Sequence, residues 1–115
     1  MKRGDIYWAE IAPRSGSKQS GRRPVIIVSH DGFNQAPGWR SIVVVPISTS
    51  ATQALRGPTA VNIPAGVGGL RKPSIALCHQ VTTLDRRKLT EHMGTLSRDL
   101  LNQVEEGLKA TLDLE

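Results

Sequence analysis

Four cationic side chains fall within ten residues of the chain, in the stretch RSGSKQSGRRP at 14–24. They are Arg14, Lys18, Arg22 and Arg23, with glycines and serines between them. Guanidinium groups make bidentate hydrogen bonds to phosphate oxygens, and glycine lets backbone N–H groups come close to an anion. The stretch therefore predicts an anion-binding loop, although the solvated cations of an ordinary surface loop would have the same composition.

Two side chains adjoin apolar runs that are too short to be helices. Arg23 directly precedes PVIIVS at 24–29, which is typical of a buried strand. Its backbone is therefore expected to be anchored on a rigid element, as a site residue requires. Ser48 follows the apolar part of SIVVVPIST at 41–49. Its hydroxyl can donate to a phosphate oxygen, but serine and threonine at a strand end also cap turns without any further role.

The elements that must position these groups are short strands followed by one helix. We expect strands at 5–13, 24–29, 41–49, 59–65 and 74–84 and a short strand or turn at 91–96, separated by loops at 14–22 and 30–40 and by a Gly-rich connector at 66–73. The helix is expected at 97–114, with Ser97 as its N-cap and Gly107 weakening it by roughly 1 kcal/mol. Its apolar stripe consists of Leu101, Val104, Leu108 and Leu112. This pattern predicts one mainly β domain over 1–115, a small antiparallel barrel or curled sheet with a C-terminal amphipathic helix packed on it.

Charge and cysteine usage narrow the class of protein. The net charge of +5 favours a polyanionic partner without identifying it. Cys78 is the only cysteine, so an intramolecular disulfide is excluded, as is usual in a reducing cytosol. The first residues contain no apolar stretch typical of a signal peptide, and no apolar run approaches the ~20 residues of a membrane span. We therefore expect a cytoplasmic protein that does not enter a membrane.

No metal or cofactor site is predicted. The three histidines, His30, His79 and His92, lack the spacing to a second cysteine or to a carboxylate cluster that a zinc site needs. The glycines of GVGGL at 66–70 are not followed by the Lys-Ser/Thr pair of a phosphate loop. Cys78 lies on an alternating strand and is expected to be a small buried hydrophobe.

The chain contains KRGDIYWAEIAP, then GSKQSGRRPVIIVSHDGFN, then VVVPIST. In order and spacing these stretches closely resemble the MazF/PemK family of endoribonuclease toxins. The segment SIALCHQVTTLDRRKLTEHMGTLSRDLLNQVEEGLKATL is similar to the family's last strands and terminal helix. The resemblance therefore covers nearly the whole chain.

This resemblance implies an SH3-like barrel, a homodimer, and metal-free cleavage of single-stranded RNA at short sequence motifs, which stops translation and growth. It also implies inhibition by a labile, acidic MazE-like antitoxin. Within the motifs, the catalytic arginine falls on Arg23 and the catalytic hydroxyl on Ser48. The glutamines near the substrate fall on Gln19 and Gln80.

Two positions depart from the family pattern. The family usually has threonine where this chain has Ser48, so the hydroxyl is kept but its rotamer is freer. It commonly has glutamate where this chain has Lys18, which replaces a carboxylate by an ammonium beside the substrate and is expected to change base preference. We expect Lys18 and Arg22 to bind RNA together with the two glutamines.

Metal-free cleavage would use the 2′-hydroxyl of the RNA as nucleophile and leave a 2′,3′-cyclic phosphate and a 5′-hydroxyl. Arg23 suits stabilisation of the extra charge on the phosphorane, because a guanidinium stays charged at any relevant pH. It is a poor general base, since its unperturbed pKa lies above ~12. Ser48 would bond a phosphate oxygen or relay a proton.

Two other functions are compatible with such a barrel. One is a non-catalytic toxin like the CcdB proteins, whose terminal helix would contact a protein target such as DNA gyrase. The other is a catalytically inactive RNA-binding module. A ribonuclease based on histidine would need two nearby imidazoles, and His79 beside Gln80 is more simply a packed or surface residue.

An antitoxin tail rich in Asp and Glu would lie along the cationic groove and fold as it binds.

Overall fold

The computed structural model describes residues 1–11, 21–49 and 57–115. Along the chain the elements are β1 (Asp5–Ile11), β2 (Gly21–Ile27), α1 (Asp31–Asn34), β3 (Ser41–Ser48), β4 (Ala60–Ile63), β5 (Ser74–Leu77), η2 (Cys78–Gln80), β6 (Thr82–Asp85), η3 (Arg86–Lys88), β7 (Leu89–Thr95) and α2 (Arg98–Leu112). Within the described ranges, no helix is long and apolar enough to cross a membrane.

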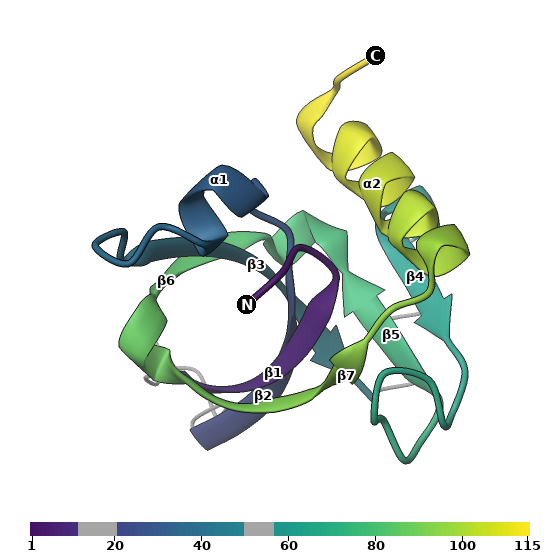
Figure 1. Cartoon of the computed structure of the whole chain (residues 1–115). Helices are drawn as coiled ribbons and strands as arrows, with labels where there is room; N and C mark the ends of the chain where they lie inside the picture. The colour runs from purple at the N-terminus through teal and green to yellow at the C-terminus, as the bar shows by residue number, and fades with distance from the viewer. Residues whose placement is uncertain (12–20, 50–56) are drawn as a thin grey trace.

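The strands form one antiparallel sheet in the order β4-β5-β3-β2-β1-β7, and β6 pairs with β3 beside this path. Strands β1, β2, β3, β6 and β7 curl into a barrel, as Figure 1 shows with the barrel seen end on. Strands β4 and β5 extend from it as an outer sheet, and α2 packs on β4 and η2. The predicted small SH3-like barrel with a C-terminal helix is confirmed.

Two hydrophobic clusters fill this architecture. The first lies inside the barrel and is built from Ala9, Val25, Ile27, Ile42 and Val44. The second lies between the outer face of the barrel, the outer sheet and α2, and it includes Ile6, Ile26, Val45, Ile47, Ala76, Cys78 and Val104. Successive residues of β2 alternate between the two clusters because strand side chains point to opposite faces. Odd-numbered residues of this strand therefore face the barrel interior.

Strand β3 belongs to both parts of the sheet. Residues 41–44 pair with β6 and residues 44–46 with β2 in the barrel, whereas Ile47 and Ser48 pair with β5 in the outer sheet. The change of partner occurs just after Pro46, whose missing N–H cannot donate to a ladder.

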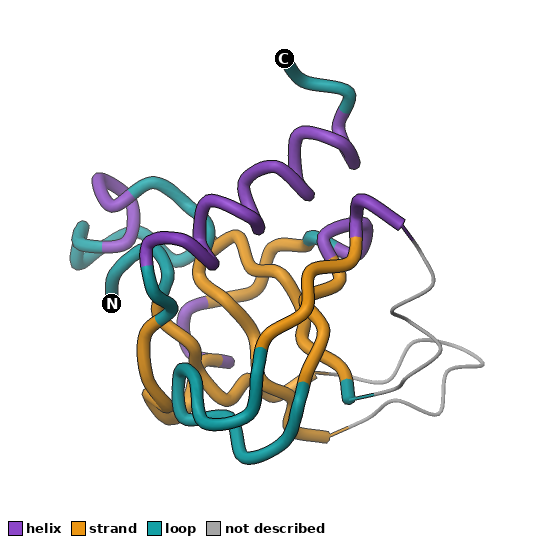
Figure 2. The backbone as a smooth tube through the Cα atoms, turned by 90° about the vertical axis from the view of Figure 1, so that its right-hand side faces the viewer, coloured by secondary structure: helices purple, strands orange, loops and turns teal. Residues whose placement is uncertain are grey.

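The terminal helix lies outside the strands, as Figure 2 shows from a second side. The Ser97 side chain accepts a hydrogen bond from the Leu100 N–H at 3.3 Å and caps the helix as predicted. Leu112, expected in the apolar stripe, is 54 % exposed. Gly107 faces Cys78: a Cβ on this glycine would lie 2.6 Å from the sulfur. The glycine thus allows the helix to approach η2, which offsets its unfavourable helix propensity.

Two predicted elements were wrong. The long strand expected at 74–84 is divided into β5 and β6 by η2, because the chain leaves the outer sheet and rejoins the barrel there. The loop expected at 30–40 contains α1, whose start is capped by the His30 side chain accepting from the Gly32 N–H at 2.8 Å. The buried cysteine is confirmed, and burial raises the pKa of the Cys78 thiol to about 11.

Candidate active site and nucleic-acid interface

Arg23 lies near the start of β2, on the strand face that lines the barrel. It pairs with Ala9 of β1, and it precedes Val25, which is completely buried in the interior cluster, by two residues. None of the described residues forms a hydrogen bond or ion pair with its guanidinium that would hold it in place. Partial burial lowers the pKa of Arg23 below its ordinary value. The charge is therefore poorly solvated where it stands, which suits a group that binds an anion.

Ser48 is the last residue of β3 and is half-buried. The ladder between β2 and β3 pairs Val25 with Pro46 and runs antiparallel. Continued by two residues beyond this last pair, the register would set Ser48 opposite Arg23 on the same face of the sheet. The two predicted residues, which are 25 positions apart in sequence, would then lie at one end of the barrel.

Arg22 points to the opposite face of β2 from Arg23. Its guanidinium lies 4.9 Å from the centroid of the Trp8 ring and forms an ion pair with Glu91 at 3.0 Å. The two adjacent arginines therefore do not form one clamp. Arg22 instead borders the outer face of the barrel, where it is held over an aromatic ring.

Of the other predicted RNA-binding residues that the structure describes, Gln80 does not join this pair within the protomer. Gln80 is exposed in η2, at the far end of β5 from Ile75, the residue that pairs with Ser48. Its neighbour His79 has both ring nitrogens buried, with no hydrogen-bond partner among the described residues. Lys18 and Gln19 lie outside the described residues, as does Arg14 of the same loop.

A cleft of about 450 Å³, which we call the Trp8 cleft, opens on the outer face of the barrel, and neither Arg23 nor Ser48 lines it. Their chain neighbours Pro24 and Thr49 line it, together with Trp8, Arg71, Lys72, Ser74 and Glu91. Two cations, Arg71 and Lys72, and one carboxylate, that of Glu91, thus line the cleft, and Arg22 contacts the lining residues Trp8 and Glu91. Sequence reasoning missed Arg71 and Lys72, whose only signal is an Arg-Lys pair after a Gly-rich turn.

Gly69 of the 66–73 connector holds this turn against β7. Gly69 has φ +81°, and a Cβ there would overlap the backbone carbonyl oxygen of Met93. We expect Gly69→Ala to lower the free energy of unfolding by at least about 2 kcal/mol, since it adds this overlap to left-handed backbone strain of roughly 1–3 kcal/mol. Urea unfolding measures the loss. Gly66→Ala is the matched control, because its φ is +87° but no atom lies within 4 Å of a Cβ there. An equal loss for both variants would show that the contact with β7 contributes nothing.

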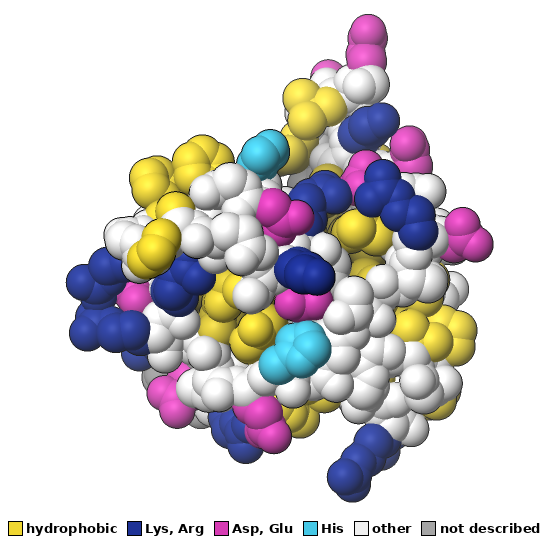
Figure 3. Space-filling model, in the orientation of Figure 1, with side chains coloured by type: hydrophobic (Ala, Val, Ile, Leu, Met, Phe, Trp, Pro, Cys, Tyr) yellow, Lys and Arg dark blue, Asp and Glu magenta, His cyan; other side chains and the backbone are white. Residues whose placement is uncertain are grey.

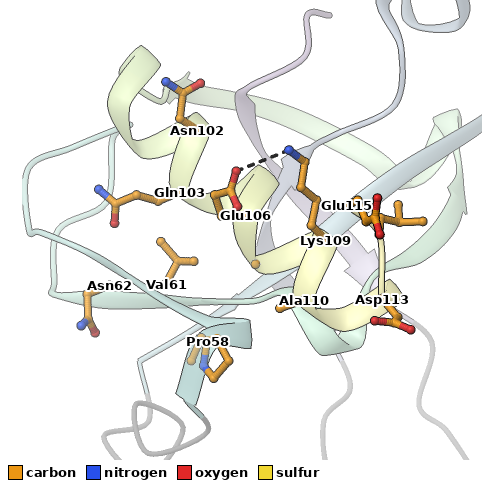
Figure 4. A pocket seen from close by; sticks show the side chains of 13 residues that line it. Pro58, Val61, Asn62, Asn102, Gln103, Glu106, Lys109, Ala110, Asp113 and Glu115 are labelled. Carbon is orange, nitrogen blue, oxygen red and sulfur yellow. Dashed lines mark hydrogen bonds and ion pairs between the residues drawn. The ribbon is translucent and has the colours of Figure 1, made fainter.

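A larger cleft, of about 860 Å³, lies between α2 and β4, and Figure 4 shows its lining. Its charged side chains are Glu106, Lys109, Asp113 and Glu115, with Lys109 and Glu106 3.4 Å apart. Three carboxylates and one ammonium repel a phosphate chain. The charges therefore favour the Trp8 cleft as the nucleic-acid interface. Among the described residues, no group of three or more His, Cys, Asp or Glu is placed to hold a metal ion.

Comparison with known proteins adds three findings. Residues 2–112 match the family described as PemK-like, MazF-like toxin of type II toxin–antitoxin system. The chain is 33 % identical over 114 residues to endoribonuclease EndoA of Bacillus subtilis, covering 99 % of this chain and 96 % of that protein. Among solved structures, Mycobacterium tuberculosis toxin MazF-mt6 superposes with a TM-score of 0.77 at 25 % identity, covering 96 % of this chain and 98 % of that one. The MazE–MazF structure (Form-II) of Deinococcus radiodurans gives the same TM-score and identity, with coverages of 100 % and 97 %.

Proposed function

This chain belongs to the PemK-like, MazF-like toxin family of type II toxin–antitoxin systems, and from that membership we propose that it is a sequence-specific endoribonuclease that cleaves single-stranded RNA. The observation that carries the proposal is the antiparallel pairing of Val25 in β2 with Pro46 in β3; continued by two residues, this register would bring Arg23 and Ser48 to the same end of the barrel. A guanidinium and an alcohol on adjacent strands can both reach one phosphodiester. Messenger RNA is the substrate whose loss would stop translation and growth.

The proposed reaction needs no metal, because RNA supplies its own nucleophile. The 2′-hydroxyl attacks the adjacent phosphorus, the bond to the 5′-oxygen breaks, and the products carry a 2′,3′-cyclic phosphate and a 5′-hydroxyl. Arg23 stabilises the additional negative charge of the phosphorane, and its partial burial strengthens that interaction. Ser48 donates a hydrogen bond to a non-bridging oxygen or relays a proton. The groups that deprotonate the 2′-hydroxyl and protonate the leaving oxygen are not assigned.

RNA is proposed to approach over the Trp8 cleft. Arg71 and Lys72 are exposed and would contact phosphates, and Arg22 would contribute from its place over the Trp8 ring. Gln80, Gln19 and Lys18 remain proposed contacts to base edges. Because Gln80 lies apart from Arg23 and Ser48 in one protomer, its role fits best with a homodimer in which the two subunits share the substrate.

The proposed partner is an acidic antitoxin in the cytoplasm. The Deinococcus radiodurans structure is by its title a MazE–MazF complex, and the present chain has the same fold over its whole length. A chain of carboxylates along Arg22, Arg71 and Lys72 would mimic phosphates and block RNA. Such binding, like that of RNA, is expected to weaken as salt rises.

A digest of a long single-stranded RNA in EDTA tests the proposed activity. We expect cleavage to persist in the chelator and to stop when a stoichiometric acidic antitoxin is added. Sequencing of the cut ends would give the recognised motif, and resistance of the new 3′ ends to enzymatic extension before phosphatase treatment would identify the cyclic phosphate. RNA that stays intact at high protein concentration would contradict the proposal and favour a toxin of the CcdB kind, which inhibits a protein target.

A further inference from the structure

The end of the barrel that carries α1 and η3 has an exposed aromatic–cationic patch. We use this name for five residues, Phe33, Trp39, Arg40, Arg87 and Lys88. Figure 3 shows hydrophobic side chains over α1 and the segment after it, with Lys and Arg side chains beside them at the left edge. The function proposed above uses none of these residues.

The two aromatic rings form a platform. Phe33 and Trp39 are 46 % and 43 % exposed, and their rings stack with centroids 4.6 Å apart and an angle of 26° between their planes. The Trp39 indole N–H donates to the Ser41 carbonyl oxygen at 2.7 Å. The indole is thus fixed in orientation although a large part of its surface meets water. Because the Trp39 side chain is already held in place, a planar group that stacks on its ring costs little conformational entropy of that side chain.

Arg86 of η3 fixes the segment that carries the platform. Its guanidinium donates to the carbonyl oxygens of Trp39 at 2.8 Å, Asn34 at 2.9 Å, Phe33 at 3.1 Å and Ala36 at 3.3 Å. The Arg86 backbone N–H donates to the Arg40 carbonyl oxygen at 2.7 Å. The aromatic rings and the cations of η3 are therefore joined in one rigid unit.

Cations outnumber carboxylates in this unit. Arg40 and Arg87 are 57 % and 80 % exposed at the side chain, and both contact Asp85, at 2.9 Å and 3.4 Å. Lys88 is exposed, and Glu10 lines a shallow depression with Lys88, Arg87 and Asp85. With Arg86 this makes four cations against two carboxylates. The Asp31 carboxylate at the start of α1 accepts instead from the Arg3 N–H and from Asn34.

From this geometry we infer that the patch is a second binding site for single-stranded RNA, separate from the cleavage site. A base would stack on the Phe33–Trp39 platform, and the flanking phosphates would meet Arg40, Arg87 and Lys88. Stacking on aromatic rings beside cations is how proteins bind single strands without reading their sequence. The inference rests on the proposed function, in which RNA is the substrate.

The position of the patch relative to the cleavage site would let this binding favour long RNA. Ser41, whose carbonyl holds the Trp39 ring, begins β3, and Ser48 ends it. The strand separates the two sites by roughly 23 Å, at about 3.3 Å per residue. A long RNA can occupy both sites, whereas a short one that fills the cleavage site cannot reach the patch. The patch would therefore raise affinity for long transcripts without changing which bond is cut.

The test uses fluorescent 2′-O-methyl RNAs of random sequence, which lack the attacking hydroxyl and stay intact, in a short and a long form. We expect Trp39→Ala to weaken binding of the long RNA by about 5- to 150-fold, the equivalent of one stacked base, and to leave the short RNA unaffected. Leu112→Ala and Arg98→Gln, which change an exposed apolar and an exposed cationic side chain on α2, serve as controls and should change neither affinity. Equal losses for Trp39→Ala and the controls would overturn the inference.

A second readout does not depend on a variant of the patch. Trp8→Phe leaves Trp39 as the only tryptophan, so its fluorescence should be quenched by the long RNA and recover as salt rises. Unchanged Trp39 emission at saturating RNA would overturn the inference. A Trp39→Ala variant that weakens binding of a protein but not of RNA would overturn it as well. Quenching of Trp39 in Trp8→Phe, together with no cleavage by the unaltered protein in EDTA, would support the patch and refute the proposed activity. Cleavage by the unaltered protein without quenching in Trp8→Phe would refute the patch alone.

Discussion

Arg23→Ala is expected to reduce the rate of RNA cleavage by at least about 10²–10³-fold, the effect of losing one preorganised donor to a developing anion. The loss should appear in kcat, because the guanidinium is proposed to act on the phosphorane more than on the bound RNA. The fold should survive the change, since no described residue depends on this side chain for a hydrogen bond. Single-turnover cleavage of a mapped substrate measures the effect.

Two conservative variants make this prediction sharper. Arg23→Lys keeps a charge but not the planar fork of donors, so we expect it to recover only a small part of the lost rate. Ser48→Thr should keep most of the activity, because the family usually has threonine there, whereas Ser48→Ala should lose it. Full activity of both Arg23→Ala and Ser48→Ala would mean that the pair has no role in the chemistry.

Arg86→Ala is expected to lower the free energy of unfolding by about 3 kcal/mol, because the change removes four hydrogen bonds to the 33–39 segment. Hydrogen bonds from a charged donor contribute roughly 1.5–3 kcal/mol each, and partial exposure reduces their sum. Four backbone carbonyl groups, of Phe33, Asn34, Ala36 and Trp39, would lose the guanidinium together, and those of Phe33 and Ala36 would keep a hydrogen bond from a backbone N–H. Urea unfolding measures the change, and the dependence of the unfolding free energy on urea concentration should be the same for the variant and the unaltered protein.

The neighbouring arginine provides the control. Arg87 is 80 % exposed at the side chain, and Arg87→Ala should change stability by no more than about 0.5 kcal/mol. Arg86→Lys should recover less than half of the loss, because one ammonium cannot reach four carbonyl groups. Equal stability of the Arg86 and Arg87 variants would show that the 33–40 segment holds its conformation without the guanidinium.

The sequence predicted the elements that depend on the apolar character and the capping preferences of neighbouring residues. The apolar runs at 24–29 and 41–49 became the buried parts of β2 and β3, and Ser97 marked the start of α2. The interruption of 74–84 by η2 was not predictable in this way. No glycine or proline marks it, and at the break the chain leaves the outer sheet for the barrel while Cys78 faces Gly107 of the helix. Tertiary contact overrode an alternating pattern that favours a continuous strand.

For the candidate site, residue types were easier to predict than their arrangement. The chain order places Arg22 and Arg23 together, but the strand pleat turns them to opposite faces. The approach of Arg23 to Ser48 depends on the register between β2 and β3, which the spacing in sequence does not determine. Arg71 and Lys72 gain their place beside the cleft from the packing of Gly69 on β7, a contact between segments distant in sequence.

The sharing of β3 between the barrel and the outer sheet has a consequence for cooperativity. β3 cannot stay paired in both parts if they separate, so the domain is expected to unfold in a single all-or-none transition, without a stable half. A ligand that binds only the native state anywhere on the molecule would then slow hydrogen exchange throughout. Protection by an antitoxin would accordingly extend well beyond the residues that it touches.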